Sequence, residues 1–192
     1  TPLGSADLVW SAPALPPTAA PGFSVWMEYP VGTWILLDNV PAGILSYRHA
    51  ITVCEDSLTF RVSYTDASGC TAFSSRDGEV FRDVTPPSVP IVVTVSVDSL
   101  TGLSTIDWDP SPETDTDGYI IVLNTPGGGI IIDTVFGQNN TYFEWLASLP
   151  GEGVESFTIA AFDTCFTGLP PSPNTSATGP AHATLYASTT YD

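Results

Sequence analysis

Lysine is absent from this sequence, and four arginines stand against 21 aspartates and glutamates. The formal net charge is −17 at pH 7. A surface of this charge repels phosphate backbones and anionic lipid headgroups. We therefore expect no nucleic acid among the partners and no insertion into a membrane, whereas divalent cations or a basic protein would be attracted.

Long apolar runs are absent too. The sequence has no stretch of about 18 apolar residues and no recognisable signal or transit peptide. It begins at Thr1 rather than at a methionine, so we expect it to be a piece of a longer or processed protein. Hydrophobic residues make up 43% of the chain, which excludes a disordered protein despite the charge.

The residues of a reaction centre are scarce. Only two histidines occur, His49 and His182, and both fall in predicted strands of different domains. No sequence pattern of a zinc protease, a serine hydrolase or a phosphate-binding loop is present. The glycines at 127–129 follow Pro126 between two predicted strands and are typical of a hairpin turn. We predict that the protein is not an enzyme and needs no cofactor.

The sequence instead contains an internal repeat of about 96 residues. Matching landmarks recur at offsets of about 96 residues: Trp10 and Trp108, Gly22 and Gly118, Ile35 and Ile130, Phe60 and Phe157, Cys70 and Cys165. A nearly constant offset over a whole domain length indicates a duplicated domain. We predict domains at 1–83 and 84–192. The proline-rich join at 83–90 predicts a short, stiff linker that holds the domains end to end.

Each copy is predicted to be all-β, because short β-rich runs alternate with proline, glycine, asparagine and aspartate. In the second copy, seven strands are expected at 89–98, 103–109, 118–124, 129–136, 141–146, 156–162 and 181–187. In the first copy, six are expected at 6–11, 22–29, 32–40, 44–53, 58–65 and 71–80. The first copy has no counterpart of 89–98. Either the strand lies outside this sequence or another chain supplies it.

The sequence motifs of both copies resemble those of a known family. The resemblance rests on a Trp in the second strand and a Tyr or Phe in the penultimate strand. It also rests on four motifs: Asp83-Val-Thr-Pro-Pro, Trp108-Asp-Pro-Ser-Pro, Asp117-Gly-Tyr-Ile-Ile and Ala160-Ala-Phe-Asp-Thr-Cys. They resemble tandem fibronectin type III modules, and more narrowly those preceding the gliding-motility-associated C-terminal sorting domain of secreted Bacteroidetes proteins. The resemblance implies two tandem fibronectin type III or immunoglobulin-like β-sandwiches, the first lacking its first strand.

The same resemblance implies a function and a location. Such modules are non-catalytic structural or adhesive spacers of proteins exported across the outer membrane by the type IX route, at the cell surface or outside the cell. The partners would be neighbouring domains of the same long chain or identical subunits. One alternative is a subunit of an extracellular filament or sheath assembled by strand donation. Another is an accessory carbohydrate-binding module.

A sugar ligand would need exposed aromatic rings. Trp26, Tyr29 and Trp34 fall on the predicted strands at 22–29 and 32–40, and rows of this kind stack on sugars. The second copy has aliphatic residues, Ile121 and Ile130, at comparable positions, which favours packing within the domain instead.

Acidic residues gather after the second strand of the second copy. Five occur within eleven residues: Asp107, Asp109, Glu113, Asp115 and Asp117. Carboxylate oxygens along a loop are ligands that Ca²⁺ accepts, although the spacing matches no EF-hand. The sequence leaves two interpretations open, a solvated acidic loop and a weak calcium site.

Modification sites are a further hypothesis. Asn139 and Asn174 fit the acceptor pattern for N-glycosylation. Ser57, Ser99 and Thr134 each follow an aspartate and precede an apolar residue. That arrangement is similar to the O-glycosylation sites of exported Bacteroidetes proteins.

Three cysteines leave one without a partner in the chain. In a fibronectin-like sandwich the loop with Cys54 lies at one pole of the first domain, and the loop with Cys165 lies at the facing pole of the second. End-to-end stacking then predicts a Cys54–Cys165 disulfide. Cys54–Cys70 pairing is less favoured, because those residues lie at opposite ends of a predicted strand, on the order of 30 Å apart. The third possibility is that all thiols are free.

Overall fold

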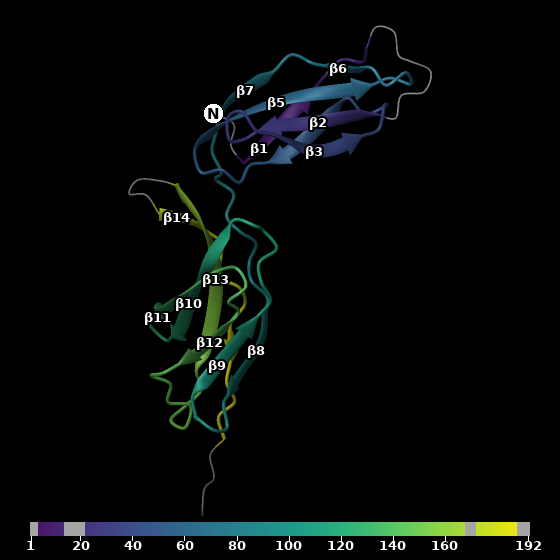
Figure 1. Cartoon of the computed structure of the whole chain (residues 1–192). Helices are drawn as coiled ribbons and strands as arrows, with labels where there is room; N and C mark the ends of the chain where they lie inside the picture. The colour runs from purple at the N-terminus through teal and green to yellow at the C-terminus, as the bar shows by residue number, and fades with distance from the viewer. Residues whose placement is uncertain (1–3, 14–21, 168–171, 188–192) are drawn as a thin grey trace, which may run out of the picture. The chain divides into compact units, whose positions relative to one another are not determined.

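The computed structural model describes residues 4–13, 22–167 and 172–187. Within them the chain forms two compact units, Thr1–Thr85 and Pro86–Asp192, which we call unit 1 and unit 2 (Figure 1). All regular elements of the described residues are β-strands. No helix in this part of the chain is long and apolar enough to cross a membrane.

Unit 2 is a two-sheet sandwich with the strand order of a fibronectin type III domain. One sheet has the order β12-β9-β8, and the other has the order β11-β10-β13-β14 with β15 also paired to β13. The strands are β8 (Val92–Val97), β9 (Ser104–Trp108), β10 (Thr116–Thr125), β11 (Gly128–Phe136), β12 (Tyr142–Trp145), β13 (Ser156–Thr167), β14 (Ser172–Thr175) and β15 (His182–Ala183).

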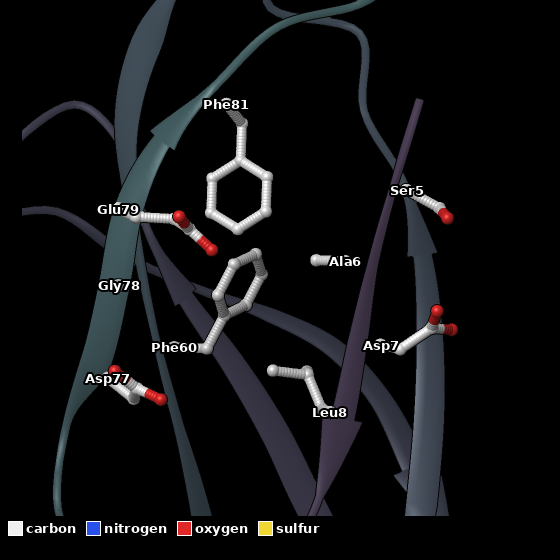
Figure 2. A pocket seen from close by; sticks show the side chains of 9 residues that line it. All are labelled: Ser5, Ala6, Asp7, Leu8, Phe60, Asp77, Gly78, Glu79 and Phe81. Carbon is white, nitrogen blue, oxygen red and sulfur yellow. The ribbon is translucent and has the colours of Figure 1, made fainter. Parts of the chain in front are cut away.

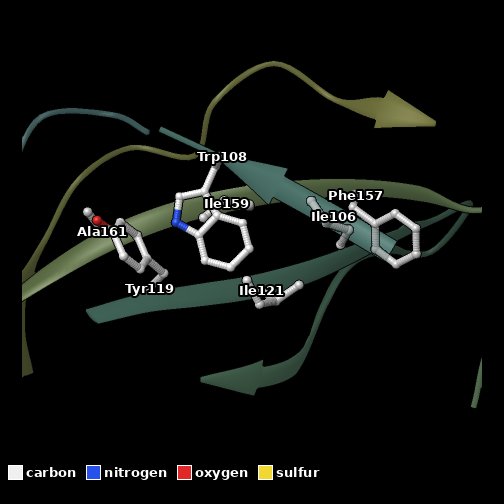
Figure 3. Packing of buried hydrophobic residues seen from close by; sticks show 7 residues of the cluster. All are labelled: Ile106, Trp108, Tyr119, Ile121, Phe157, Ile159 and Ala161. Atoms are coloured by element: carbon white, nitrogen blue, oxygen red, sulfur yellow. The ribbon is translucent and has the colours of Figure 1, made fainter. Parts of the chain in front are cut away.

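The core of unit 2 forms where the inward residues of the two sheets meet (Figure 3). Alternate residues of β13, Phe157, Ile159 and Ala161, belong to this core. Trp108 enters from the opposite sheet and packs edge-on against Tyr119, with 5.2 Å between ring centroids. Trp108 is 3% exposed, and its ring fills the space between the two sheets.

Unit 1 repeats the plan with one strand fewer. Among the described residues, one sheet holds only β1 and β4, and the other has the order β3-β2-β5-β6 with β7 also paired to β5. The strands are β1 (Ser5–Val9), β2 (Phe23–Glu28), β3 (Trp34–Val40), β4 (Ser46–Ala50), β5 (Asp56–Thr65), β6 (Thr71–Phe73) and β7 (Asp77–Phe81). No strand of the described residues takes the place that β8 has in unit 2, as the sequence predicted.

The repeated glycines have a steric cause. A Cβ on Gly118 would collide with the carbonyl oxygen of Val135 on β11, and one on Gly22 would collide with that of Val40 on β3. Gly22 also has a φ of +135°, where side chains are rarely tolerated. The close approach of neighbouring strands at this point therefore requires glycine in both units.

The last strand of each unit differs from the prediction. We expected single strands at 71–80 and 181–187, but the first is split into β6 and β7, and in unit 2 an unpredicted strand, β14, precedes β15. A serine marks the break each time. The N–H of Val62 donates to the Ser74 hydroxyl at 2.9 Å, and the N–H of Ala161 donates to the Ser176 hydroxyl at 2.9 Å. A side-chain oxygen thus replaces a backbone carbonyl, and the strand bends.

Candidate functional site

The acidic residues of unit 2 occupy the end of β9, the loop that follows it and the start of β10. Asp107 lies in β9, where its carboxylate accepts a hydrogen bond from the Thr94 hydroxyl at 2.9 Å. Asp109 is exposed, and Asp115 and Asp117 are half-buried. In the described residues, no three His, Cys, Asp or Glu side chains converge in a group that could hold a metal ion.

Glu113 is turned inward and holds the loop in place. Its carboxylate accepts hydrogen bonds from the backbone N–H of Ser88 at 3.1 Å, from the Ser88 hydroxyl, and from the Ser111 hydroxyl at 2.8 Å. Burial by itself would raise the pKa of Glu113, but these donors outweigh it and the pKa lies below its ordinary value. The Gln138 amide closes the loop by donating to the carbonyl oxygens of Ser111 and Glu113, each at 2.8 Å.

Asp163 on β13 is a carboxylate that the sequence did not single out. It is 1% exposed, and burial raises its pKa. The N–H of Cys165, at 2.7 Å, and the Asn174 side chain oppose that rise, whereas the negative charges of Asp115 and Asp117 add to it. The negative charges of Asp115 and Asp117, at the start of β10, therefore help to raise the pKa of the buried Asp163.

Apolar side chains surround the same neighbourhood. A shallow hollow of about 390 Å³ is lined chiefly by Phe136, Phe162, Phe166 and Pro173, with Asp117 and Asp163 at its edge. Phe136 and Phe166 are more than half exposed. Phe136 ends a predicted strand, whereas Phe166 lies beyond the strand predicted at 156–162 and belongs to the longer β13.

The aromatic row of unit 1 is present but is not a free sugar platform. Tyr29 packs against the hydrophobic core. The Trp26 indole N–H donates to the Ser63 hydroxyl at 2.8 Å. The Arg61 guanidinium lies 3.8 Å from the centroid of the Trp34 ring and 4.3 Å from that of Phe73.

Arg76 extends this arrangement, with its guanidinium 5.2 Å from the centroid of Trp34. We call Trp34, Arg61, Phe73 and Arg76 the aromatic–arginine stack. It uses two of the four arginines of the chain. Guanidinium groups over rings stabilise a sheet surface, and they occupy the ring face that a sugar would need.

The histidines are separate and differ in environment. His49 in β4 is half-buried, with its ring edge-on to Phe60 at 6.0 Å between centroids, and burial lowers its pKa. His182 starts β15 in the other unit. They therefore belong to different sandwiches, as the sequence predicted.

The candidate modification sites differ in exposure. Asn139, Ser57 and Ser99 are exposed, and Thr134 is half-buried in β11. Asn174 is only 4% exposed and contributes to the hydrogen bonding of Asp163. This burial argues against Asn174 as a glycan acceptor in the folded protein.

The cysteines follow the prediction. Cys54 and Cys165 are disulfide-bonded, and Cys70 is the exposed free cysteine.

No protein-family model matches the chain, and no curated protein sequence matches it. Among solved structures, the chain is similar to a two-domain fibronectin type III segment of chicken tenascin, at 14% identity and a TM-score of 0.49, over 94% of this chain and 91% of that one. It is similar to the chicken interferon gamma receptor alpha chain at 12% identity and a TM-score of 0.43, over 95% and 96% of the two chains.

A third similar structure contains the FN1–FN3 domains of chicken CNTN1, at 15% identity and a TM-score of 0.35. The match covers 94% of this chain, which spans about 60% of the length of that structure.

Proposed function

We propose that this chain is a pair of non-catalytic structural or adhesive spacer modules of an exported protein. The observation that carries the proposal is that carboxylate side chains accept hydrogen bonds within the domains. In both units, carboxylates that face hydroxyl and N–H groups hold turns and strands together, as Glu113 does.

Glu155 is a second example in unit 2. Its carboxylate accepts hydrogen bonds from the hydroxyls of Ser104 and Ser148 at 2.5 and 2.6 Å, and from the N–H of Leu149 at 2.6 Å. One side chain thus ties the start of β9 to the segment after β12. A carboxyl group with three donors from separate segments connects those segments inside the domain.

Turn aspartates repeat this use of a carboxylate. Asp66 accepts from the N–H groups of Ser68 and Cys70, and Asp98 accepts from those of Leu100 and Thr101. The Ser68 hydroxyl, which donates to Asp66 at 2.6 Å, and the N–H donors lower the pKa of Asp66, and the N–H donors of Thr101 and Leu100 lower the pKa of Asp98. The carboxylates consequently stay ionised and fix the tight turns of a rigid module.

An extracellular site of action is part of the proposal. A disulfide persists in oxidising surroundings, and the acidic surface favours solubility outside the cell. Export by the type IX route rests on the sequence resemblance.

Single-molecule stretching in reducing buffer tests the spacer function. Two rigid sandwiches should give two discrete unfolding events, each releasing about 80–100 residues and therefore about 300 Å of contour length. A smooth extension without events would contradict the proposal. So would turnover of ester, glycoside or peptide substrates that is lost when a single carboxylate is replaced.

A further inference from the structure

Unit 2 contains almost no positive charge. All four arginines of the chain lie in unit 1, and the sequence from Pro86 to Asp192 has neither lysine nor arginine. Both ion pairs of the described residues, Arg48 with Asp7 and Arg82 with Glu55, are accordingly in unit 1. A carboxylate of unit 2 that is kept from water therefore has no guanidinium or ammonium partner in its own unit.

One hollow of unit 2 combines aromatic walls with such carboxylates. It has a volume of about 390 Å³, and its apolar lining includes Phe136 of β11, Phe162 and Phe166 of β13, and Pro173 of β14. The rings of Phe136 and Phe162 meet edge-on, with 5.7 Å between their centroids. Pockets for small molecules span about 300–1,000 Å³, so this one, which we call the phenylalanine hollow, is large enough for one small ligand.

Two of the rings can be reached by a solute. Phe136 and Phe166 are more than half exposed, and neither belongs to the hydrophobic core of unit 2. Exposed apolar side chains that gather around a concave surface are typical of ligand-binding sites.

Asp163 lies at the edge of this hollow with an unused hydrogen-bond acceptor. It is 1% exposed, and one carboxylate oxygen accepts the N–H of Cys165 at 2.7 Å. The other oxygen, Oδ2, is buried and has no hydrogen-bond partner among the described residues. Buried acceptors are normally satisfied, so an unsatisfied one points to a water, an ion or a ligand. Burial also raises the pKa of Asp163, and perturbed carboxyl groups in apolar hollows are typical of functional sites.

Asp115 and Asp117 add to the negative potential at this place. Asp117 lines the hollow, and the charges of both residues act on Asp163. The other polar residues of the lining are Thr134 and Thr164, and no described residue of the lining is basic. The hollow therefore attracts a positive charge and repels a negative one.

The lining also determines which kind of cation fits. Calcium needs at least six oxygen ligands, and the described residues hold no group of three His, Cys, Asp or Glu that could bind a metal ion. An organic ammonium ion suits the lining better, because its alkyl groups can lie against the rings, whose faces attract cations. A fully alkylated nitrogen makes no hydrogen bond, so its charge can act on the buried oxygen of Asp163 across a short distance of low dielectric constant.

The hollow between β1 and β7 in unit 1 provides a contrast. Figure 2 shows the rings of Phe60 and Phe81 beside the side chains of Asp77 and Glu79. Both phenylalanines are buried in the core, and both acidic residues are exposed. Those rings are not available to a ligand, and water and salt screen those carboxylates. The phenylalanine hollow instead pairs accessible rings with a buried carboxylate.

We propose that the phenylalanine hollow binds an alkylated ammonium group, whose alkyl substituents contact Phe136 and Phe166 and whose charge faces Asp163 and Asp117. The rings supply apolar contact, and the carboxylates select a cation over a neutral molecule of the same shape. The inference goes beyond the spacer function and does not depend on it, because a spacer without this site would still be a spacer.

Choline and its uncharged isostere test the proposal. In the isostere a tert-butyl group replaces the trimethylammonium group, so shape is kept and charge is lost. Each is titrated into the intact isotope-labelled chain, and NMR chemical shifts are followed at constant ionic strength with sodium chloride. We expect choline to shift the signals of Phe136, Phe166 and the Cys165 N–H, and to bind about tenfold more tightly than the isostere.

Three substitutions locate the site. Asp117→Asn should weaken choline binding and leave binding of the isostere unchanged, and Phe166→Leu should weaken both. Asp77→Asn removes the same charge from the hollow of unit 1 and should change neither. Asp163→Asn should reduce the preference for choline, and if that variant does not fold, the two substitutions at Asp117 and Phe166 still decide the matter.

Three results would overturn the proposal. One is the absence of choline-dependent shifts around the hollow at concentrations far above millimolar. Another is equal affinity for choline and the isostere, which would leave only an apolar hollow. The third is an equal loss of affinity in Asp77→Asn and Asp117→Asn, which would assign the effect to the net charge of the chain.

Sedimentation with phosphatidylcholine vesicles distinguishes the source of the ammonium group. Cosedimentation that free choline competes away would assign the group to a lipid headgroup. Choline binding without cosedimentation would assign it to a free solute. Both outcomes agree with the proposed site and differ only in what carries the ligand.

Discussion

The charge of His49 couples the stability of unit 1 to pH. Burial lowers its pKa, so the folded state favours the neutral ring. The stability this contributes is complete above the ordinary histidine pKa of about 6.5 and is lost as the pH falls through the lower folded value. We expect the melting temperature of unit 1 to drop between pH 7 and pH 5, and His49→Gln to flatten that drop. His182→Gln is the control, and an unchanged slope in His49→Gln would contradict the assignment.

Arg61 is the centre of the aromatic–arginine stack. Its guanidinium contacts the rings of Trp34 and Phe73, and each contact of this kind stabilises by about 0.5–1 kcal/mol at a surface. Arg61→Ala should therefore lower the free energy of unfolding by about 1–2 kcal/mol in urea titrations followed by tryptophan fluorescence. Arg76→Ala, at the longer distance from Trp34, should cost less. A larger loss for Arg76→Ala would show that ring contact is not the cause.

Among the elements, the split last strands depend on two serine hydroxyls. Ser176 is buried and accepts the N–H of Ala161, while Ser74 is exposed and accepts that of Val62. Removing a partner from a buried N–H costs about 1–3 kcal/mol. We expect Ser176→Ala to lower the free energy of unfolding by that amount and Ser74→Ala to cost less, since water can replace its hydroxyl. Ser75→Ala keeps the backbone intact and should be near neutral in the same denaturation measurements.

The loop between β9 and β10 gives a prediction about calcium. Glu113 accepts hydrogen bonds from Ser88 and Ser111, and Asp107 accepts one from Thr94. Two of the five carboxylates therefore already have donors within the protein. We expect millimolar Ca²⁺ to leave the melting temperature of unit 2 unchanged in differential scanning fluorimetry, with Mg²⁺ as the control. A rise specific to Ca²⁺ would show that the loop rearranges to bind it.

For the whole molecule, the disulfide sets the response to reducing agent. Non-reducing peptide mapping should recover one disulfide-linked pair that contains Cys54 and Cys165, with Cys70 alkylated. Closing a loop of this length is expected to stabilise the folded chain by about 5 kcal/mol in the chain-entropy model. Cys54→Ser should therefore lower the melting temperature, and Cys70→Ser should not. A Cys54–Cys70 peptide pair would contradict the assignment.

Repetition made the architecture predictable, because Trp108 and Trp10, or Gly118 and Gly22, mark the same strand in two copies. The lack of a first strand in unit 1 was visible for the same reason. Alternation of apolar residues could not reveal β14, whose residues Ser172–Thr175 include a proline and are mostly polar. The break in each last strand depends on one hydroxyl in three-dimensional reach of a backbone N–H, which hydrophobic periodicity does not encode.

The sites were less predictable than the fold. An acidic run such as Asp107 to Asp117 has the same composition whether its carboxylates face a cation or face serines. Trp34 reads as an exposed ring until Arg61, 27 positions away along the chain, is seen to lie over it. Side-chain partners from distant strands decide both cases, and a single sequence carries little information about them.

The two-strand sheet of unit 1 has a consequence under mechanical load. When this chain is pulled by its two ends, tension reaches β1, which contributes Ala6 to the core and, among the described residues, pairs with β4 alone. Peeling β1 away removes half of that sheet and opens the core at once. In unit 2 the first strand to be pulled is β8, and its loss still leaves β9 paired with β12. Unit 1 should therefore unfold at a lower force than unit 2, and the chain should lengthen first by the unfolding of unit 1.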